Sequence, residues 1–205
     1  QNVNSYGKGL DEPLNFAELL EEVEKIEGLE RIRFMTSHPK DLSEELIDAM
    51  RDCEKVCLHL HLPLQSGSSR ILKLMNRRYT KEQYLDLVDR IRAKVPDVSL
   101  TTDIIVGFPG ETEEDFKELV EFVKWARFER MGAFAYCEED DTYAAKNFSD
   151  SIPQEVKESR LEEIMTIQED VALESNQSKI GKTMTVVIDR EEPDYFVGRT
   201  EFDSR

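Results

Sequence analysis

The sequence has few cysteines and no long apolar run. Its three cysteines, Cys53, Cys57 and Cys137, cannot form a disulfide framework, and they are typical of a reducing compartment. No segment approaches the roughly 20 consecutive apolar residues of a membrane-spanning helix, and no signal-peptide pattern opens the chain. We therefore expect a soluble, cytoplasmic protein without a membrane partner.

Basic residues are also scarce, because 27 Lys and Arg stand against 44 Asp and Glu and give a net charge of -17. A protein this acidic is not a natural non-specific nucleic-acid binder, and it suits a basic protein partner. Residues 51–100 are the exception, with ten basic and six acidic residues and a net charge of +4. One stretch in this region either faces phosphate or forms a solvated helix face; its basic residues are Arg70, Lys73, Arg77, Arg78 and Lys81.

The spacing of Cys53, Cys57, His59 and His61 is C-x3-C-x-H-x-H, which at first suggests a zinc site. On an extended strand, Cys57, His59 and His61 would point from one face, with about 6–7 Å between successive positions. Three such side chains rarely converge on one tetrahedral ion. We expect buried cysteines and one pocket-facing histidine instead, and no metal site.

Apolar runs and helical patterns alternate along the first two thirds of the 205 residues. This alternation predicts an α/β fold with a parallel sheet. Expected strands cover residues 30–35, 56–62, 98–106 and 131–136. Expected helices cover residues 14–27, 43–50 and 68–75, and two more begin at Thr80 and Thr112. Residues 137–152 are acidic and irregular, residues 153–178 form one long helix, and residues 183–188 and 195–200 form a hairpin.

Polar, glycine and proline residues gather where the predicted strands end. The motifs are TSHP at 36–39, HLHLPLQSGS at 59–68 and DIIVGFPGE at 103–111. A parallel α/β barrel presents its binding face in this way. The glycine-rich element at 107–110 is either a ligand loop or a plain tight turn, and the segment at 65–68 either binds a ligand or caps the following helix. His38 and His61 both lie at expected strand ends.

Together with residues 1–7 (QNVNSYG), these motifs resemble the radical SAM methylthiotransferases. That family joins an N-terminal domain, a partial parallel (βα) barrel and a small C-terminal β domain of the TRAM type. The resemblance implies a partial barrel at residues 1–150, a connecting helix at 151–179 and the start of an incomplete TRAM-like domain at 180–205. It also implies a fragment or chimera, because the expected cluster motif, C-x3-C-x2-C, is missing from the sequence.

The resemblance divides along the chain. The first part is similar to enzymes that methylthiolate isopentenyl-adenosine in tRNA. From about Glu129 onward the chain is similar to enzymes that modify an aspartate of ribosomal protein S12, through residues 132–136, 138–143 and 195–203. The resemblance thus leaves tRNA and S12 as alternative partners.

The family uses S-adenosylmethionine and [4Fe–4S] clusters. By resemblance, one side of the S-adenosylmethionine site is formed by Gln1, Ser37, His61, Gln65, Asp103, Gly107 and Phe108, and residues 106–109 flank the adenine. Each of these residues also has an ordinary structural explanation in a strand-to-helix loop. No general acid or base is identified. The alternatives are a catalytically silent α/β chain and an unrelated barrel enzyme that uses His38 and His61 as metal ligands.

Because an iron–sulfur cluster needs cysteine thiolates in place, we predict that the 205-residue chain forms no [4Fe–4S] cluster when reconstituted with iron and sulfide. Its absorbance and electron paramagnetic resonance spectra should match those of iron-free protein. Cluster formation with cleavage of S-adenosylmethionine by this chain alone would contradict the prediction.

Overall fold

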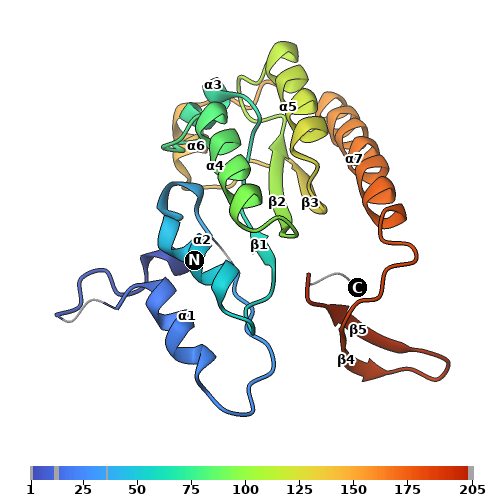
Figure 1. Ribbon diagram of the computed structural model, residues 1–205. Helices are drawn as coiled ribbons and strands as arrows, with labels where there is room; N and C mark the ends of the chain where they lie inside the picture. Colours follow the sequence, from blue (N-terminus) through green and yellow to red (C-terminus); the bar gives the residue numbers. More distant parts are fainter. Residues whose placement is uncertain (1, 12–13, 36, 203–205) are drawn as a thin grey trace. The chain divides into compact units, whose positions relative to one another are not determined.

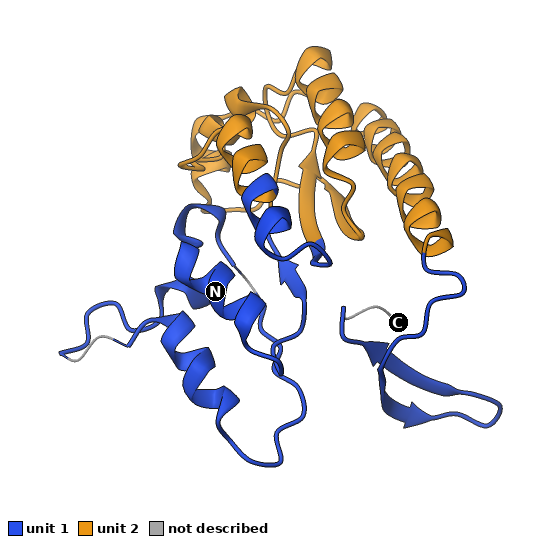
Figure 2. Ribbon diagram, viewed as in Figure 1, with its two compact units in different colours: residues 1–62, 89–100, 179–205 blue, residues 63–88, 101–178 orange. Residues whose placement is uncertain are grey.

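The computed structural model describes residues 2–11, 14–35 and 37–202. The chain divides into two compact units (Figure 2). Unit 1 contains residues 1–62, 89–100 and 179–205, and unit 2 contains residues 63–88 and 101–178. Each unit therefore draws on separate stretches of sequence.

Three strands form one sheet in the order β1 (His59–His61), β2 (Ser99–Val106) and β3 (Arg130–Ala135) (Figure 1). β2 and β3 are parallel and in register from Thr101 opposite Arg130 to Val106 opposite Ala135. Most of β2 is buried, as is usual for a parallel strand covered on both faces. The parallel sheet confirms the predicted fold class.

Two predicted strands are shorter than expected. The strand expected at 56–62 is reduced to three residues, and the one expected at 30–35 is only a single parallel bridge between Ile32 and Val56. A second isolated bridge lies beyond the end of β1, where Gln65 pairs with Ile104 of β2. Both bridges are parallel, so they keep the βα pattern.

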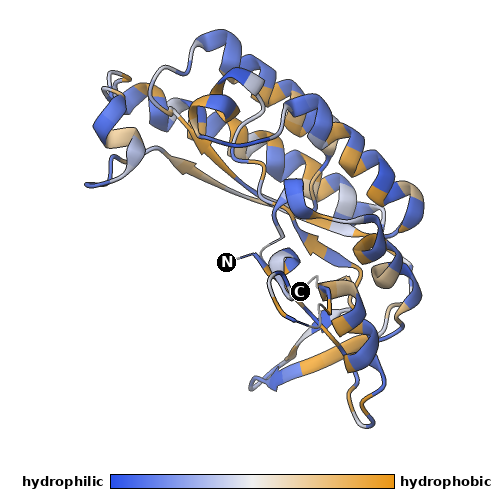
Figure 3. Ribbon diagram, turned by 90° about the vertical axis from the view of Figure 1, so that its left-hand side faces the viewer, coloured by the Kyte–Doolittle hydropathy of each residue, from blue (hydrophilic) through white to orange (hydrophobic). Residues whose placement is uncertain are grey.

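Helices cover the strands of unit 2. α5 (Glu113–Ala126) begins with a capping box formed by Thr112 and Asp115, as the sequence predicted. α7 (Gln154–Gln177) packs against β3 and α5. The rings of Tyr84, Phe122 and Phe128 meet in the core between these elements. Figure 3 shows hydrophobic and hydrophilic residues alternating along the helices, as expected for helices that cover a sheet.

The expectation of irregular structure at 137–152 is wrong in part. α6 (Tyr143–Asn147) forms a short helix there. Thr142 is its N-cap, because the Thr142 hydroxyl accepts a hydrogen bond from the Ala145 amide. The ring of Tyr143 packs edge-on against Phe148, with 6.1 Å between centroids. These two local contacts stabilise a turn that hydrophobic periodicity alone does not reveal.

Unit 1 contains α1 (Phe16–Glu24), α2 (Glu44–Asp52) and the antiparallel hairpin of β4 (Val186–Glu191) and β5 (Phe196–Thr200). Two short 3-10 turns, Val3–Ser5 and Pro39–Asp41, also lie in unit 1. α1 starts with a capping box of Asn15 and Glu18. Within unit 1 the Leu58 amide donates to the carbonyl of Glu201, the residue after β5, at 3.2 Å.

No helix in the described part of the chain combines the length and the apolar character needed to cross a bilayer.

The segment between α3 (Ser69–Leu74) and α4 (Lys81–Lys94) is fixed by backbone geometry. Asn76 has a left-handed φ of 57°, its amide donates to the Lys73 carbonyl, and the Arg77 amide donates to the Leu72 carbonyl at 2.8 Å. This pair of bonds is a Schellman motif, which ends the helix and fixes the direction of the chain at Arg77.

We predict that Asn76→Gly leaves stability unchanged or slightly higher, because glycine tolerates this φ. A β-branched residue does not, so Asn76→Val should lower the free energy of unfolding by about 1 kcal/mol or more. Urea denaturation of the two variants measures the difference. Equal stability of both variants would contradict the left-handed cap.

Candidate functional site

Unit 2 contains a pocket of about 330 Å³ at the carboxyl end of β2. This volume falls within the usual range for small-molecule sites. The pocket is open on one side, and backbone or side-chain atoms from the loop after β1, the end of α3, the end of β2 and the start of α6 form its wall. Its lining residues are Gln65, Leu74, Met75, Asn76, Arg77, Ile105, Phe108, Tyr136, Tyr143 and Ala144.

An aromatic corner forms one wall of the pocket. The Phe108 ring meets Tyr136 edge-to-face at 5.3 Å and Phe148 at 5.8 Å between centroids. Tyr136 is buried, and its hydroxyl has no hydrogen-bond partner among the described residues. Burial and the carboxylates of Glu138 and Asp150 raise the pKa of Tyr136, so its hydroxyl stays protonated and is a free donor. A buried hydroxyl without a partner is uncommon, and Tyr136 lies in the wall of the pocket.

Gln65, another lining residue, is held by two backbone bonds to β2. Its amide donates to the Asp103 carbonyl and its carbonyl accepts the Ile105 amide, both at 2.9 Å. Its φ of 75° is left-handed, which turns the chain out of the strand register at this point. Arg77 is also among the lining residues, and within the described residues no carboxylate forms an ion pair with it.

The loop after β2 turns sharply at Gly107, which has a φ of 72°. The Gly107 amide donates to Glu111 Oε1 at 2.9 Å, and the Glu111 amide donates to the Phe108 carbonyl at 2.8 Å. A Cβ at Gly107 would lie only 2.5 Å from Lys157 Cγ. Both the backbone angle and this close approach require glycine.

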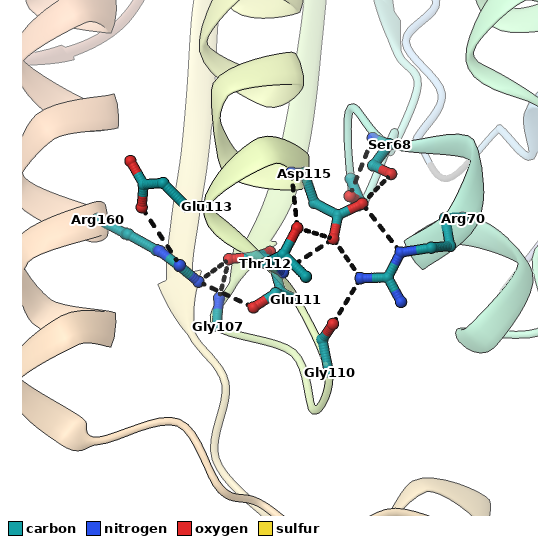
Figure 4. A network of polar contacts seen from close by, with 10 residues as sticks. Ser68, Arg70, Gly107, Gly110, Glu111, Thr112, Glu113, Asp115 and Arg160 are labelled. Atoms are coloured by element: carbon teal, nitrogen blue, oxygen red, sulfur yellow. Dashed lines mark hydrogen bonds and ion pairs between the residues drawn. The ribbon is translucent and has the colours of Figure 1, made fainter.

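The Glu111 side chain is buried and forms an ion pair with Arg160 of α7, with 2.8 Å between Oε1 and Nη1 (Figure 4). The pKa of the Glu111 carboxyl is raised, because burial outweighs the bonds from the Gly107 amide and the Arg160 guanidinium that lower it. One carboxylate oxygen thus accepts both the loop amide and the guanidinium.

A second polar cluster lies on the other side of the loop, around Asp115 (Figure 4). Asp115 accepts the Ser68 hydroxyl at 2.6 Å and the Thr112 amide at 2.8 Å, and it forms an ion pair with Arg70. Arg70 Nη2 also donates to the Gly110 carbonyl at 2.5 Å. The Ser68 hydroxyl makes no cap bond to α3, so it joins the two helices instead.

The structure places the predicted site residues as follows. Gln65 and Phe108 line the pocket, and Gly107 turns the loop behind Phe108. Asp103 is not among the lining residues; its carboxylate packs beside Gly132. Ser37 and His61 belong to unit 1, where the Ser37 amide donates to the His61 carbonyl at 3.3 Å. Gln1 lies outside the described residues.

The sequence did not identify two of the polar lining residues, Arg77 and Tyr136. Tyr136 is the last residue of the strand predicted at 131–136, so its position at a strand end was a usable signal. Arg77 lies between two helices and far from any strand end, and only the turn at Asn76 brings it to the pocket.

The chain's own residues do not fit an iron–sulfur cluster. Cys53 and Cys57 are buried in unit 1, and Cys137 is exposed in unit 2. Across residues 2–11, 14–35 and 37–202, no three His, Cys, Asp or Glu side chains are grouped so that they could hold a metal ion. A cluster therefore has no ligand set among these side chains.

Comparisons with known proteins agree with this fold. The model of the radical SAM superfamily matches residues 9–123. The tRNA-2-methylthio-N(6)-dimethylallyladenosine synthase of Acetivibrio thermocellus is 53% identical over 98% of this chain, and the synthase of Thermoanaerobacter sp. (strain X514) is 55% identical over 92%. The chain covers only 42% and 40% of those two proteins.

A solved structure shares the fold at low identity. The radical SAM enzyme coproporphyrinogen III oxidase of Escherichia coli superposes with a TM-score of 0.57 and 20% identity, over 69% of this chain and 32% of that one. The match of the family model to residues 9–123 shows that the chain belongs to the radical SAM superfamily.

We predict that Asp115→Asn destabilises the fold at neutral pH by about 2 kcal/mol, because it weakens charged hydrogen bonds to a buried group. Burial works against ionisation of Asp115, yet bonds from Arg70, Ser68 and Thr112 outweigh it and hold its pKa well below the usual range. The carboxylate therefore stabilises the fold above the unfolded-state pKa of about 3.9, and this contribution is lost as the pH falls toward the folded-state pKa.

Chemical denaturation from neutral pH downward measures this effect. The difference in unfolding free energy between wild type and Asp115→Asn should become smaller below about pH 4. Glu121→Gln is the control, since Glu121 is an exposed member of a surface pair on the same helix. If this difference in unfolding free energy stays constant down to acid pH, the lowered pKa of Asp115 is contradicted.

Proposed function

We propose that this chain forms the S-adenosylmethionine-binding part of a methylthiotransferase that modifies tRNA. The observation that carries the proposal is the unit 2 pocket, which joins an aromatic corner, a buried unpartnered hydroxyl and a guanidinium without a described acidic partner. We assign residues 1–150 to a partial barrel, 151–179 to a connecting helix and 180–205 to the start of a TRAM-like domain. We place the protein in the cytoplasm.

The pocket residues suit the chemical groups of S-adenosylmethionine. Arg77 is suited to its carboxylate, because guanidinium and carboxylate form strong paired hydrogen bonds. Phe108 and Tyr136 are suited to the flat adenine, and Gln65 supplies amide donors and acceptors for the ribose or methionyl group. When bound in a complete radical SAM enzyme, the cofactor supplies the radical that removes a hydrogen atom from the substrate.

We assign Ser37, His61 and Asp103 to the same cofactor site, together with Gln1, on the strength of their motifs alone. We derive no step through an iron–sulfur cluster, because the cysteines of this chain do not form a ligand set for one. The cluster ligands of the complete enzyme would come from outside these residues.

The relatives favour tRNA as the substrate. Both are named for synthesis of a methylthiolated N(6)-dimethylallyladenosine in tRNA, and the match to the first covers 98% of this chain, including most of the part that resembled S12 enzymes. They give no support to ribosomal protein S12. The acceptor in our proposal is therefore an adenosine that carries a dimethylallyl group.

Binding of S-adenosylhomocysteine and of adenosine, measured by isothermal titration calorimetry, tests the cofactor site. Phe108→Ala should weaken both ligands about tenfold, because both contain adenine. Arg77→Gln should weaken only S-adenosylhomocysteine, by about tenfold, because adenosine has no carboxylate. Lys73→Gln is the matched control, since it removes an exposed charge four residues away that does not line the pocket.

Two outcomes would contradict the proposal. The first is that neither ligand binds, or that Lys73→Gln and Arg77→Gln behave alike. The second concerns the substrate: in a binding titration, an RNA stem–loop that carries N(6)-dimethylallyladenosine should bind more tightly than protein S12, and the reverse order would exclude tRNA.

A further inference from the structure

Helix α7 buries two cations in its first two turns. Lys157 and Arg160 are 3% and 8% exposed, whereas long charged side chains usually extend into water. Burying a charge costs free energy that a single ion pair often does not recover. The Arg160 Nε is also buried without a described hydrogen-bond partner. Stability alone is therefore a poor explanation for these two residues.

Arg160 contacts the loop that carries Phe108. Its Nη1 donates to Glu111 Oε1 at 2.8 Å, and the same oxygen accepts the Gly107 amide at 2.9 Å. The guanidinium also lies over the Phe116 ring of α5, 5.4 Å from the centroid. The position of the Glu111 carboxylate, and through it the Gly107 amide, is thus fixed from α7 (Figure 4).

Lys157 contacts Tyr136, the other member of the same aromatic corner. Its Nζ donates to the Tyr136 carbonyl at 3.1 Å and to Asp150 at 2.5 Å, and it lies 5.2 Å from the centroid of the Tyr136 ring. Its carbon chain occupies the space beside Gly107 that a Cβ would need. One side chain of α7 therefore touches the strand end that carries Tyr136 and the loop that carries Phe108.

We propose that Lys157 and Arg160 are positioning residues, which hold Phe108 and Tyr136 in their edge-to-face packing, so that the aromatic corner keeps the shape on which the adenine of the cofactor would pack. The proposal rests on the cofactor site proposed above. We call these contacts of Lys157 and Arg160 the clamp: they hold the two aromatic residues in place without contacting the ligand. Because loop and strand end are both held by buried bonds, the aromatic corner is preformed before a ligand arrives.

Amide hydrogen exchange of ligand-free protein tests the clamp independently of any cofactor. Arg160→Leu and Lys157→Met should speed exchange at Gly107 by about tenfold, and they should weaken S-adenosylhomocysteine by about tenfold through misplacement of Phe108. Arg160→Lys keeps the charge, so its exchange rate at Gly107 and its affinity for S-adenosylhomocysteine should lie between those of wild type and Arg160→Leu. Glu174→Gln is the matched control, because it removes an exposed ion pair to Arg127 on the same helix.

A double variant separates positioning from folding. Glu111→Leu with Arg160→Leu removes both buried charges, so its unfolding free energy should lie near that of wild type. The acceptor of the Gly107 amide is still missing, so exchange there should stay fast and the ligand should stay weakly bound. If the double variant exchanges and binds like wild type, or if single variants lose only stability, the positioning role is wrong.

The same data distinguish the two proposals. If wild type binds no S-adenosylhomocysteine, the cofactor site is contradicted, whereas exchange at Gly107 still shows whether α7 holds the loop. If wild type binds and the α7 variants change neither exchange nor affinity, the clamp alone is overturned.

Discussion

The geometry of the pocket depends on one buried carboxylate. Glu111 accepts the Gly107 amide and the Arg160 guanidinium on the same oxygen, so it links the turn after β2 to helix α7. Without this link, the buried loop amide would lose its acceptor and a buried guanidinium its charge partner, which is among the most costly losses inside a protein. The position of Phe108, one residue beyond the turn, follows from it.

The Asp115 cluster stabilises the same loop by a different route. Asp115 caps α5, and it also holds Ser68 and Arg70 from the segment that follows Gln65. Arg70 in turn reaches the Gly110 carbonyl. The two carboxylates therefore hold the loop from its two flanks: Glu111 ties it to α7, and Asp115 ties it to α3. The pocket lies where elements fixed in these two ways meet.

Features set by neighbours in sequence were predictable, and features set by distant partners were not. The capping box of Thr112 and Asp115 and the helix that follows were predicted correctly, because a cap involves residues three apart. The strand expected at 30–35 became one bridge, because a strand exists only as far as its partner pairs with it. The pocket shows the same limit: the GFPG motif indicated Phe108, whereas nothing local indicated that Arg77 lines the same pocket or that Arg160 contacts the loop beside it.

Charge counts are a weak guide to what a protein binds, because ion pairs neutralise many of the charges that they include. Two of the five cations in the basic stretch are neutralised by ion pairs, Arg70 with Asp115 and Lys81 with Glu118. Arg77 instead reaches the pocket without an acidic partner among the described residues. A net charge of -17 averages over such differences, because Coulomb interactions between exposed charges fade beyond about 10 Å. An acidic chain can therefore hold an anion, provided that one cation is placed by a rigid turn such as that at Asn76 and left uncompensated.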